Sequence, residues 1–405
     1  MTFASALVAL EVLLGVVVLL PTTYLAVLAL ASVRARRTST ARSTTRLAFL
    51  IAAHDEEAAL PLTLAALRGV IGQDDAIVHV VADNCHDRTA EVARAAGACV
   101  HERREIARPG KAAALNSLTA EVLAEDRSSE AFAIIDADAR PDPGFLEGLR
   151  SALRPEVEVV QAVNLVEAAE EAPLALVRRL AFHLKCELRP IAFEKLGCSV
   201  GLHGNGMCFR REVLRRYRWN ERSVVEDAEM HLRLVADGVR VRFAPGAVLR
   251  SDMPRRFRGA AGQAVRWERG KFDLLGPGAR LVLSGLVTAR VAPLAAGYDA
   301  LVPPLSFLVA AGLLSALLGA VTDRGLAAIG ALALLGLGGY VARGIVLAGM
   351  GPRAVLRIGM WAPAYIAWKI AILARAAAGA GRGTWAQARL TSSVVVPTET
   401  WAGDG

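Results

Sequence analysis

The sequence has little cysteine, and no two of its cysteines have the Cys-x-x-Cys spacing. The five cysteines are also an odd number, so the sequence predicts neither a disulfide framework nor a zinc site. A chain that folds in the reduced environment of the cytosol is the simpler interpretation. The residues are Cys85, Cys99, Cys186, Cys198 and Cys208.

Aromatic residues are few, at 5%, and the segment from Val33 to Arg46 contains no acidic residue. This segment is rich in arginine, and the chain has a net charge of +8. No aromatic side chains alternate with these arginines to stack on bases, so we expect no nucleic-acid partner. Arginines directly after an apolar run are typical of a juxtamembrane anchor on the cytosolic side, with anionic membrane lipids as its partner.

Long apolar runs are abundant. Hydrophobic residues make up 54% of the chain and the mean hydropathy is +0.38, which indicates a soluble domain joined to membrane segments. Residues 12–32 form an almost uninterrupted apolar run, about the ~20 residues that a membrane helix needs. A cleaved signal peptide is the alternative, but here basic residues follow the run instead of preceding it. We expect a membrane helix with its N-terminus outside.

The C-terminal part of the chain carries further apolar runs. Residues 301–321 and 326–341, joined by a short polar turn, predict a membrane hairpin. Residues 274–296 mix apolar residues with arginines, as an interfacial amphipathic segment does. Residues 355–373 include an arginine and a lysine, which leaves either a third span or an interfacial helix, and we favour the interfacial helix.

Between these runs the pattern is that of an α/β domain. Short apolar runs alternate with helical periodicity over residues 47–243, which predicts βα units and a largely parallel sheet. The expected strands are residues 47–53, 77–82, 132–135, 158–163 and 239–244. The expected helices are residues 56–70, 87–96, 111–124, 173–194 and 227–237. The expected units are an N-terminal transmembrane helix (1–33), a basic linker (34–46), a cytosolic domain (47–272), an interfacial segment (273–298), a transmembrane hairpin (299–350), and an interfacial or third membrane helix with a basic tail (351–405).

The chain is organised around an apolar run that ends in two acids. The five residues from Ala131 to Ile135 predict a fully buried strand, which leads into Asp136 and Asp138. Side chains two apart on an extended backbone point the same way, here beyond the carboxyl end of the strand, where open α/β sheets bind ligands. Two hard oxygen ligands at this place suit Mg²⁺ or Mn²⁺ holding a diphosphate. A solvated acidic turn is the alternative.

More charged groups are expected at the same edge of the sheet. Asp55 and Glu57 follow the first strand, and Asp83 follows the second. In nucleotide-binding α/β units such acids accept hydrogen bonds from ribose hydroxyls or a base, although Asp55 and Asp83 would also serve as helix N-caps. Lys111 opens a helix, where a lysine beside free backbone N–H groups is suited to binding a diphosphate.

Two later segments carry candidate binding or catalytic groups. A glycine-rich loop over residues 201–207 lets backbone approach a ligand closely, or is a plain turn. Its candidate residues are His203, Gly204, Asn205 and Gly206. Glu226 and Asp227 begin a helix, where acids favour the helix dipole, but Asp227 could also be a general base for an attacking hydroxyl.

Gln263, Arg266 and Trp267 share one helical face at i, i+3 and i+4. Arg266 could clamp a phosphate, and Trp267 offers a ring on which a sugar could stack. An amphipathic helix at a membrane surface would also use arginine and tryptophan, so this segment alone does not distinguish a binding site from a membrane-surface helix.

Taken in order, these motifs resemble those of the membrane-bound family-2 glycosyltransferases, which include cellulose, chitin, hyaluronan and poly-N-acetylglucosamine synthases. The resemblance covers roughly residues 47–271. Two positions depart from the family pattern, since Asp55 replaces an asparagine and Val225 replaces a threonine. The motifs are Asp83, Lys111, Asp136-Ala137-Asp138, Glu226-Asp227 and Gln263-Ala264-Val265-Arg266-Trp267.

This resemblance implies a GT-A (Rossmann-like) α/β fold, with one N-terminal and two or three C-terminal membrane segments. It implies a nucleotide-diphosphate sugar donor, a Mg²⁺ or Mn²⁺ cofactor and inversion at the anomeric carbon. By position it makes Asp227 the catalytic base, with Glu226 as the next candidate. It implies metal and diphosphate binding by Asp136 and Asp138. The implied donor-binding residues are Asp55, Glu57, Asp83, Lys111, Asp136 and Asp138, and the implied acceptor- or product-binding residues are His203, Gly204, Asn205, Gly206, Gln263, Arg266 and Trp267.

The expected function is therefore that of a multi-pass membrane hexosyl- or N-acetylhexosaminyltransferase with a cytosolic catalytic domain. Its acceptor is a carbohydrate or a lipid, as in cell-surface polysaccharide or glycolipid synthesis. The alternatives are a non-processive enzyme that adds one sugar to a lipid or lipid-linked intermediate, and a catalytically silent membrane scaffold that binds nucleotide. The presence of every proposed catalytic acid argues against the scaffold.

Overall fold

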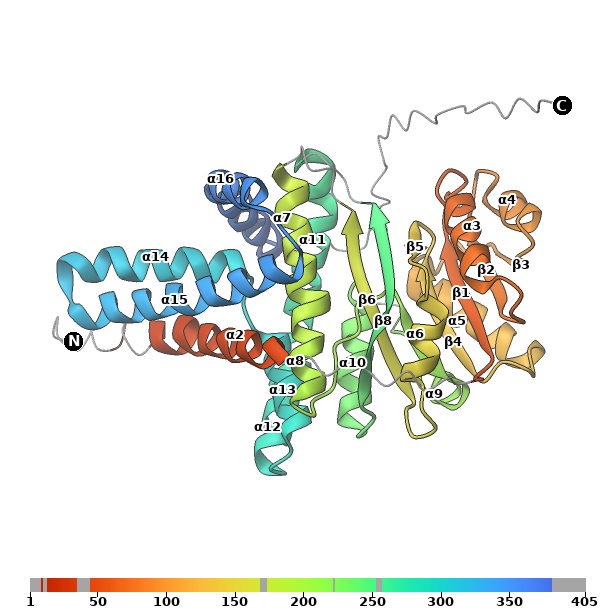
Figure 1. Cartoon of the computed structure of the whole chain (residues 1–405), viewed down its shortest axis with the longest axis horizontal. Coiled ribbons are helices and arrows are strands. Elements are labelled where there is room, and N and C mark those ends of the chain that lie inside the picture. The colour runs from red at the N-terminus through yellow and green to blue at the C-terminus, as the bar shows by residue number, and fades with distance from the viewer. Residues whose placement is uncertain are drawn as a thin grey trace.

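The structure is a computed structural model that describes residues 9, 13–34, 44–167, 173–220, 223–252 and 257–380. Most of the predicted basic linker and the C-terminal tail lie outside these residues. The described chain forms an α/β domain with a bundle of apolar helices projecting from one side (Figure 1). The predicted α/β fold class with flanking apolar helices is therefore confirmed.

An eight-stranded sheet with the order β3-β2-β1-β4-β7-β6-β8-β5 forms the centre of this domain. The first four strands in this order pair in parallel, whereas β7 lies antiparallel between β4 and β6. Beyond them β8 is parallel to β6, and β5 is antiparallel to β8. The strands are β1 (Leu47–Ala53), β2 (Ile77–Asp83), β3 (Cys99–Arg103), β4 (Ala131–Asp136), β5 (Ala139–Pro141), β6 (Val159–Glu167), β7 (Met207–Arg210) and β8 (Val241–Asp252).

Helices cover both faces of the sheet, as expected for strands that are apolar on both sides. Every residue of β1 is buried, and its side chains alternate between two hydrophobic cores. One core includes α3 (Leu60–Ile71), α4 (Thr89–Ala95) and α6 (Phe145–Ala152). The other core includes α5 (Lys111–Glu125), α7 (Pro173–His183), η3 (Leu184–Leu188), α8 (Arg189–Lys195), α9 (Arg211–Arg216) and α10 (Glu226–Ala236).

The strand register brings the predicted acids to one edge of the sheet. Ala52 of β1 lies opposite Asp136 at the end of β4, and Ala53 lies opposite Ala82, one residue before Asp83. The carboxyl ends of β1, β2 and β4 therefore meet at one place. The chain turns directly after β4, at Ala137 and Asp138, instead of remaining extended.

One long helical segment, expected over residues 173–194, forms with an irregularity in its middle. α7 continues through the π-helical turn η3 into α8, and this rod crosses the projecting bundle at a steep angle (Figure 1). π-helical turns in proteins frequently lie at functional sites. Here the turn contains Lys185 and Cys186.

The strand β3 and the short helices α6 and α9 were not expected from the sequence. β3 pairs with β2 at the edge of the sheet and carries charged side chains on a half-exposed surface, so it lacks the apolar run by which the other strands were found. β6 and β8 are longer than predicted because polar residues, such as Asn164 and Ser251, continue the strands toward the sheet edge.

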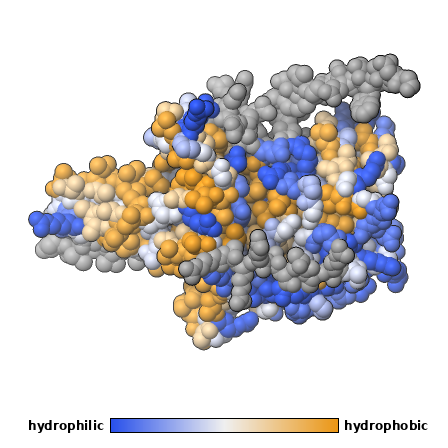
Figure 2. All heavy atoms as spheres, viewed as in Figure 1, coloured by the Kyte–Doolittle hydropathy of each residue, from blue (hydrophilic) through white to orange (hydrophobic). Residues whose placement is uncertain are grey.

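Three helices form the bundle that projects from the domain. α14 (Leu305–Thr322) and α15 (Arg324–Leu347) are antiparallel neighbours, and α2 (Leu20–Ala31) packs beside α15 (Figure 1). Gly330 of α15 lies so close to α14 that an added Cβ would be 2.3 Å from the Ala316 nitrogen. The outer surface of the bundle is hydrophobic, whereas hydrophilic residues gather on the sheet domain (Figure 2). The predicted hairpin is confirmed as a pair of apolar helices that are long enough to cross a membrane.

The remaining apolar helices run along the side of the domain from which the bundle projects. α12 (Leu275–Val287) and α13 (Val291–Leu301) form a pair that packs on α10, and α16 (Pro352–Ala377) packs on α7 and α11 (Phe257–Asp273). α16 is also long and apolar enough to cross a membrane, so by length and composition it is a third candidate span. The expectation of an interfacial helix in this region stays a prediction.

Candidate active site

A cavity of about 2360 Å³ opens at the carboxyl ends of β1, β2 and β4. It continues between η3, α10 and α11 and ends among α14, α15 and α16. Pockets that bind one small molecule typically measure ~300–1,000 Å³. This cavity therefore has room for more than one ligand.

Lys111 joins three segments at the centre of the cavity wall. Its ammonium group forms an ion pair with the Asp136 carboxylate and donates a 2.8 Å hydrogen bond to the Gly204 carbonyl. Burial alone would lower the pKa of Lys111, but the carboxylates of Asp136 and Glu226 outweigh this and raise the pKa above its usual value. The site therefore contains a permanently charged ammonium group at the start of α5.

The glycine at position 204 is required by this arrangement. Its φ of +74° is a left-handed conformation that favours glycine. A Cβ at this position would lie 3.3 Å from the Asp227 carboxylate and 3.8 Å from the Lys111 ammonium. The left-handed backbone is therefore the reason that glycine is favoured here, and a Cβ would add only a tight contact with Asp227.

A buried polar network supports the glycine-rich loop from below. The Gln161 side chain donates a 2.8 Å hydrogen bond to the Asn205 carbonyl and accepts one of 3.0 Å from the His203 backbone N–H. The Asn205 amide oxygen in turn accepts a 3.1 Å hydrogen bond from the Asp136 backbone N–H. Asn205 and Gly206 therefore lie beneath the cavity surface, whereas His203 and Gly204 line the cavity.

Glu226 and Asp227 are the first two residues of α10, and both line the cavity. Both acids lie in the first turn of α10, where they also favour the helix dipole. Burial raises the pKa of the Glu226 carboxyl, and the neighbouring Asp227 raises it further, while Lys111 opposes the rise. Two adjacent carboxyl groups in different environments are the arrangement expected of an acid–base site.

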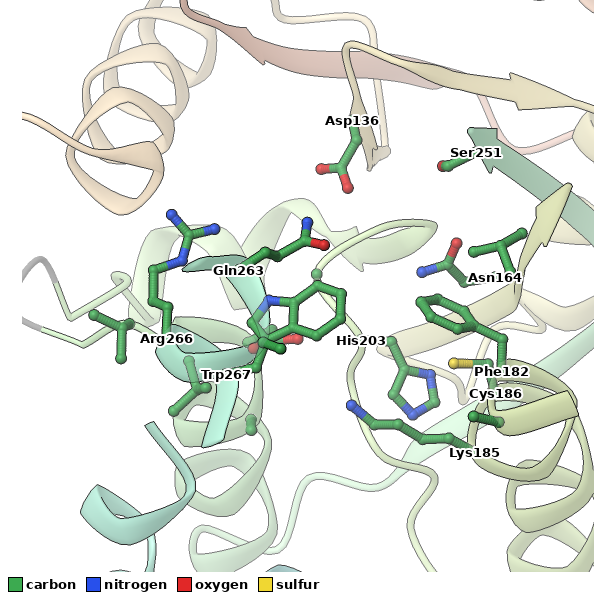
Figure 3. A pocket seen from close by; sticks show the side chains of 18 of the residues that line it. Asp136, Asn164, Phe182, Lys185, Cys186, His203, Ser251, Gln263, Arg266 and Trp267 are labelled. Atoms are coloured by element: carbon green, nitrogen blue, oxygen red, sulfur yellow. The ribbon is translucent and has the colours of Figure 1, made fainter. Parts of the chain in front are cut away.

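Gln263, Arg266 and Trp267 also line the cavity, on α11 (Figure 3). The Gln263 amide oxygen is buried and has no hydrogen-bond partner among the described residues, so a ligand hydroxyl could donate to it. The Trp267 ring packs with Phe182, with a centroid distance of 6.5 Å. This face of α11 therefore presents an aromatic ring and an unsatisfied acceptor to the cavity.

α11 is held close to the start of α10 by a second glycine. A Cβ on Gly270 would lie 2.4 Å from the Val225 side chain. Val225 thus packs against α11, at the position where the family pattern has threonine. This contact brings the cavity-lining face of α11 toward Asp227.

Asp83 is fully buried and forms an ion pair with Arg103 of β3, which also contacts Glu105. One oxygen of the Asp83 carboxylate has no hydrogen-bond partner among the described residues, although Asp83 lines the cavity. Such a buried acceptor is expected to bind a donor group of a ligand. Neither Asp83 nor Asp55 caps a helix.

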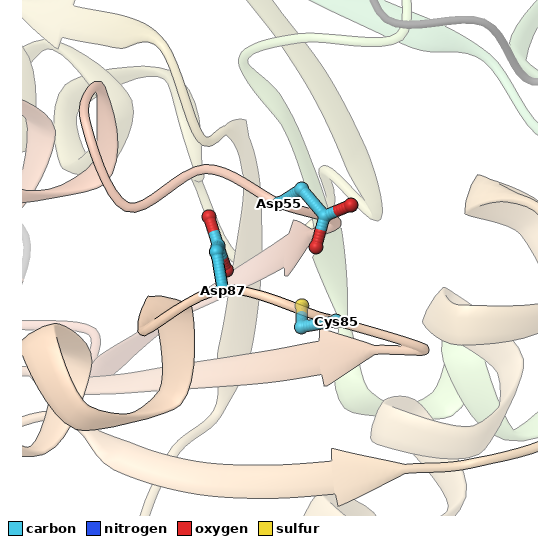
Figure 4. Close-up of side chains that lie close together, drawn as sticks. All are labelled: Asp55, Cys85 and Asp87. Atoms are coloured by element: carbon cyan, nitrogen blue, oxygen red, sulfur yellow. The ribbon is translucent and has the colours of Figure 1, made fainter.

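Asp55 lies at the entrance, in a left-handed conformation with a φ of 52°. Its carboxylate accepts a 2.7 Å hydrogen bond from the His86 backbone N–H, and it lies near Cys85 and Asp87 (Figure 4). Asp87 accepts hydrogen bonds from the backbone N–H groups of Thr89 and Glu57, which accounts for its position without a metal ion. These hydrogen bonds therefore join the loop after β1 to the loop after β2.

Most of the predicted site residues come together in this cavity. Those on its surface are Asp55, Asp83, Lys111, Asp136, Asp138, His203, Gly204, Glu226, Asp227, Gln263, Arg266 and Trp267. Glu57 is not on the cavity surface, and its carboxylate accepts a hydrogen bond from the Arg88 backbone N–H.

Sequence reasoning missed several cavity residues and their supports. Gln161 and Asn164 stand out in retrospect, because they are polar residues within an apolar strand. Lys185, Lys271 and Lys369 were also missed, although lysine is rare in this arginine-rich chain.

Asp136 and Asp138 are the residues suited to hold a divalent metal ion. Both are half-buried and line the cavity on either side of buried Ala137. Carboxylate oxygens are the ligands that Mg²⁺ and Mn²⁺ prefer, so the donor set fits such an ion.

Known proteins resemble this chain in sequence and in structure. A probable glucomannan 4-beta-mannosyltransferase 14 of Arabidopsis thaliana is 26% identical over 173 residues, covering 40% of this chain and 31% of the relative. A probable glycosyltransferase, YdaM of Bacillus subtilis (strain 168), is 25% identical over 248 residues, covering 56% of this chain and 55% of the relative. The matches thus span a third to about half of the length of these relatives.

A solved structure matches nearly the whole chain. Mannosyltransferase PcManGT from Pyrobaculum calidifontis, in complex with GDP-Man and Mn²⁺, has a TM-score of 0.56 and 19% sequence identity. The match covers 91% of this chain and 98% of that one, which establishes a shared fold, that of the GT-A glycosyltransferases.

The family model described as glycosyl transferase family group 2 matches residues 131–374, more than half of the chain. The matched region begins at β4, so it includes Asp136 and Asp227, whereas Asp83 and Lys111 precede it. The chain therefore belongs to the family-2 glycosyltransferases, with a GT-A catalytic domain and apolar helices long enough to cross a membrane.

Proposed function

We propose that this protein is a membrane glycosyltransferase that moves a sugar from a nucleotide-diphosphate donor to an acceptor hydroxyl, with inversion at the anomeric carbon. One observation carries the proposal: Lys111, Asp136, Asp138 and Asp227 line a single cavity at the carboxyl edge of the sheet. The cavity continues past Trp267 toward the apolar helices, which provides space for an acceptor. The pathway we favour is cell-surface polysaccharide or glycolipid synthesis.

Each wall of the cavity would contact a different part of the substrates. The unsatisfied oxygen of Asp83 is placed to accept a hydrogen bond from the base, and Asp55 lies at the same entrance. The charged Lys111 would bind the diphosphate, beside the start of α5. Gln263 and Trp267 would contact sugar on the acceptor side.

In the reaction, the acceptor hydroxyl oxygen would attack the anomeric carbon as the bond from that carbon to the diphosphate oxygen breaks. Asp227 would take the hydroxyl proton, and the nucleoside diphosphate would leave with its charge balanced in part by Lys111. The helix N-terminus at Asp227 favours the carboxylate form that a base needs. Asp136 and Asp138 would hold a divalent ion such as Mn²⁺ or Mg²⁺, which would neutralise part of the diphosphate charge.

The membrane arrangement is also part of the proposal. The hydrophobic outer surface of α2, α14 and α15 supports insertion of this bundle, and the arginines after the first apolar run support a catalytic domain in the cytosol. The cytosol is where a soluble nucleotide sugar would reach the open edge of the sheet.

The role of Asp227 is tested by Asp227→Asn, which keeps the size of the side chain but cannot take a proton. Positioned general bases contribute ~10²–10⁴-fold, so turnover should fall by about that factor. Donor affinity should change little. The measurement is release of nucleoside diphosphate together with equilibrium donor binding.

Glu229→Gln is the matched control, because Glu229 lies on the same helix but binds Asn220 outside the cavity. It should retain near-normal turnover. If Asp227→Asn also kept normal turnover, Asp227 would not be the base, and Glu226 would be tested next.

The metal role is tested by Asp138→Ala and by chelation. Removing one of two carboxylate ligands should abolish the Mn²⁺-dependent part of donor binding, while the thermal unfolding midpoint stays near that of the wild type. EDTA should stop wild-type turnover, and added Mn²⁺ or Mg²⁺ should restore it. Asp75→Ala, at an exposed site outside the cavity, is the control. Full activity in EDTA would contradict the metal role.

The orientation is tested by labelling cysteines in intact cells with a membrane-impermeant maleimide. Native Cys99 is exposed on the catalytic domain and should react only after permeabilisation. A cysteine at Thr38, which lies outside the described residues, should behave in the same way. Thr322→Cys, next to Asp323 in the hairpin turn, should react in intact cells. Labelling of position 38 or Cys99 from outside would overturn the orientation.

A further inference from the structure

The lysines of this chain are concentrated in one place. The sequence contains five lysines and many more arginines. Lys111, Lys185, Lys271 and Lys369 line the cavity, although they come from four different elements, and only Lys195 does not. A lysine ammonium is a mobile point charge with three donors, which suits an anion that binds and leaves.

These lysines fall into two groups. Lys111 interacts with Asp136, Glu226 and Asp227 at the sheet edge. Lys271 interacts instead with Glu268, Lys369 and Lys185. In the close-up view Trp267 lies between Asp136 and Lys185 (Figure 3). The second group, Lys185, Lys271 and Lys369, which we call the lower lysine cluster, is thus separate from the proposed diphosphate site.

The lower lysine cluster carries more positive charge than its surroundings neutralise. Glu268 binds Lys271 and Lys369, with N–O distances of 3.0 and 2.7 Å, and is itself buried. Lys185 is exposed to the cavity and has no acidic partner among the described residues. Glu268 is therefore paired with two of the three ammonium groups, and Lys185 adds a third positive charge to the cavity surface.

Beyond this cluster the cavity becomes apolar. Its far wall is made by side chains of the membrane helices α14, α15 and α16, among them Val309, Val341, Ile358 and Ile366. Tyr340, Tyr365 and Trp368 add aromatic rings to this end of the cavity. Aliphatic side chains in membrane helices are suited to hydrocarbon.

We propose that the acceptor is an anionic phospholipid or glycolipid whose headgroup combines a phosphate with a sugar or polyol hydroxyl. Its phosphate binds the lower lysine cluster, its hydrocarbon enters the apolar end, and its hydroxyl reaches Asp227 past Trp267. This inference rests on the proposed function and narrows its acceptor. In the transfer, the hydroxyl oxygen bonds to the anomeric carbon, its proton passes to Asp227, and the nucleoside diphosphate leaves with the electron pair of the broken bond.

Lys185 is the lysine to substitute. Lys271 and Lys369 are less suitable, because their ion pairs with Glu268 join α11 to α16 and their loss would disturb the fold. Lys185→Gln removes the charge at an exposed position, so the fold should survive. The matched control is Lys195→Gln, on the adjoining helix α8 and outside the cavity. Lys185→Arg keeps the charge and serves as the conservative variant.

The experiment measures binding of short-chain lipids to the full chain in neutral detergent. Dioctanoyl phosphatidylinositol, which has phosphate, hydroxyls and tails, is compared with glucosyl dioctanoylglycerol, which lacks the phosphate, and with glycerophosphoinositol, which lacks the tails. The phosphatidylinositol should bind roughly ten-fold more tightly than either, and Lys185→Gln should remove most of this preference, since about 1.4 kcal/mol corresponds to ten-fold. Lys195→Gln should bind like the wild type, and Lys185→Arg should retain most of the preference.

Two results would overturn the proposal. Equal binding of the three probes would mean that neither phosphate nor tails are recognised, and unchanged binding by Lys185→Gln would mean that the cluster does not hold the phosphate. Displacement of the lipid by a neutral β-linked hexasaccharide, with no effect of Lys185→Gln, would instead identify a polysaccharide acceptor. Donor binding and slow hydrolysis of the donor by water should be the same for Lys195→Gln as for the wild type, and their absence in the wild type would refute the proposed function separately.

Discussion

The contact of the Lys111 ammonium with the Asp136 carboxylate and the Gly204 carbonyl holds the site together. It joins the start of α5, the end of β4 and the glycine-rich loop, which come from distant parts of the sequence. Asp136, Glu226 and Asp227 surround this one ammonium, and without it their negative charges would repel one another. Because three carboxylates surround one ammonium, the site keeps a net negative charge that attracts further cations. In the proposed function, Lys111 and a divalent ion would allow this cluster of acids to bind a diphosphate, which is itself an anion.

The sheet domain and the apolar helices are also joined by charged side chains. Arg189 of α8 binds Asp299 of α13 at 2.9 Å and donates to the Tyr340 hydroxyl of α15 at 3.0 Å. Tyr24 of α2 donates to the same Asp299 carboxylate. Three of these residues line the cavity, so the group that anchors the bundle also forms part of the wall between the catalytic end and the apolar end. Arg189 is half-buried and paired, so the junction between the sheet domain and the apolar helices stays polar.

Sequence reasoning located the fold and most of the site because apolar runs and acids at strand ends depend on local sequence. The strand from Leu47 to Ala53 was predicted with its observed bounds, and Asp136, Asp138 and Asp227 all face one cavity. The lower lysine cluster could not be predicted, since Lys185, Lys271 and Lys369 come together only through the packing of η3, α11 and α16. The edge strand β3 was missed because half-exposed edge strands lack a continuous apolar pattern, and with it the ion pair of Arg103 with Asp83 was missed.

The central claim is a single displacement in which Asp227 activates the acceptor while Lys111 binds the leaving group. No covalent sugar intermediate forms in such a reaction, so the anomeric configuration must invert. The direct measurement is the anomeric one-bond C–H coupling of the first product formed from whichever nucleotide sugar supports turnover, recorded by NMR and compared with the donor. The account predicts the opposite configuration, a β-linked product from an α-linked donor. Retention would contradict it and would require a nucleophile on the opposite face of the sugar.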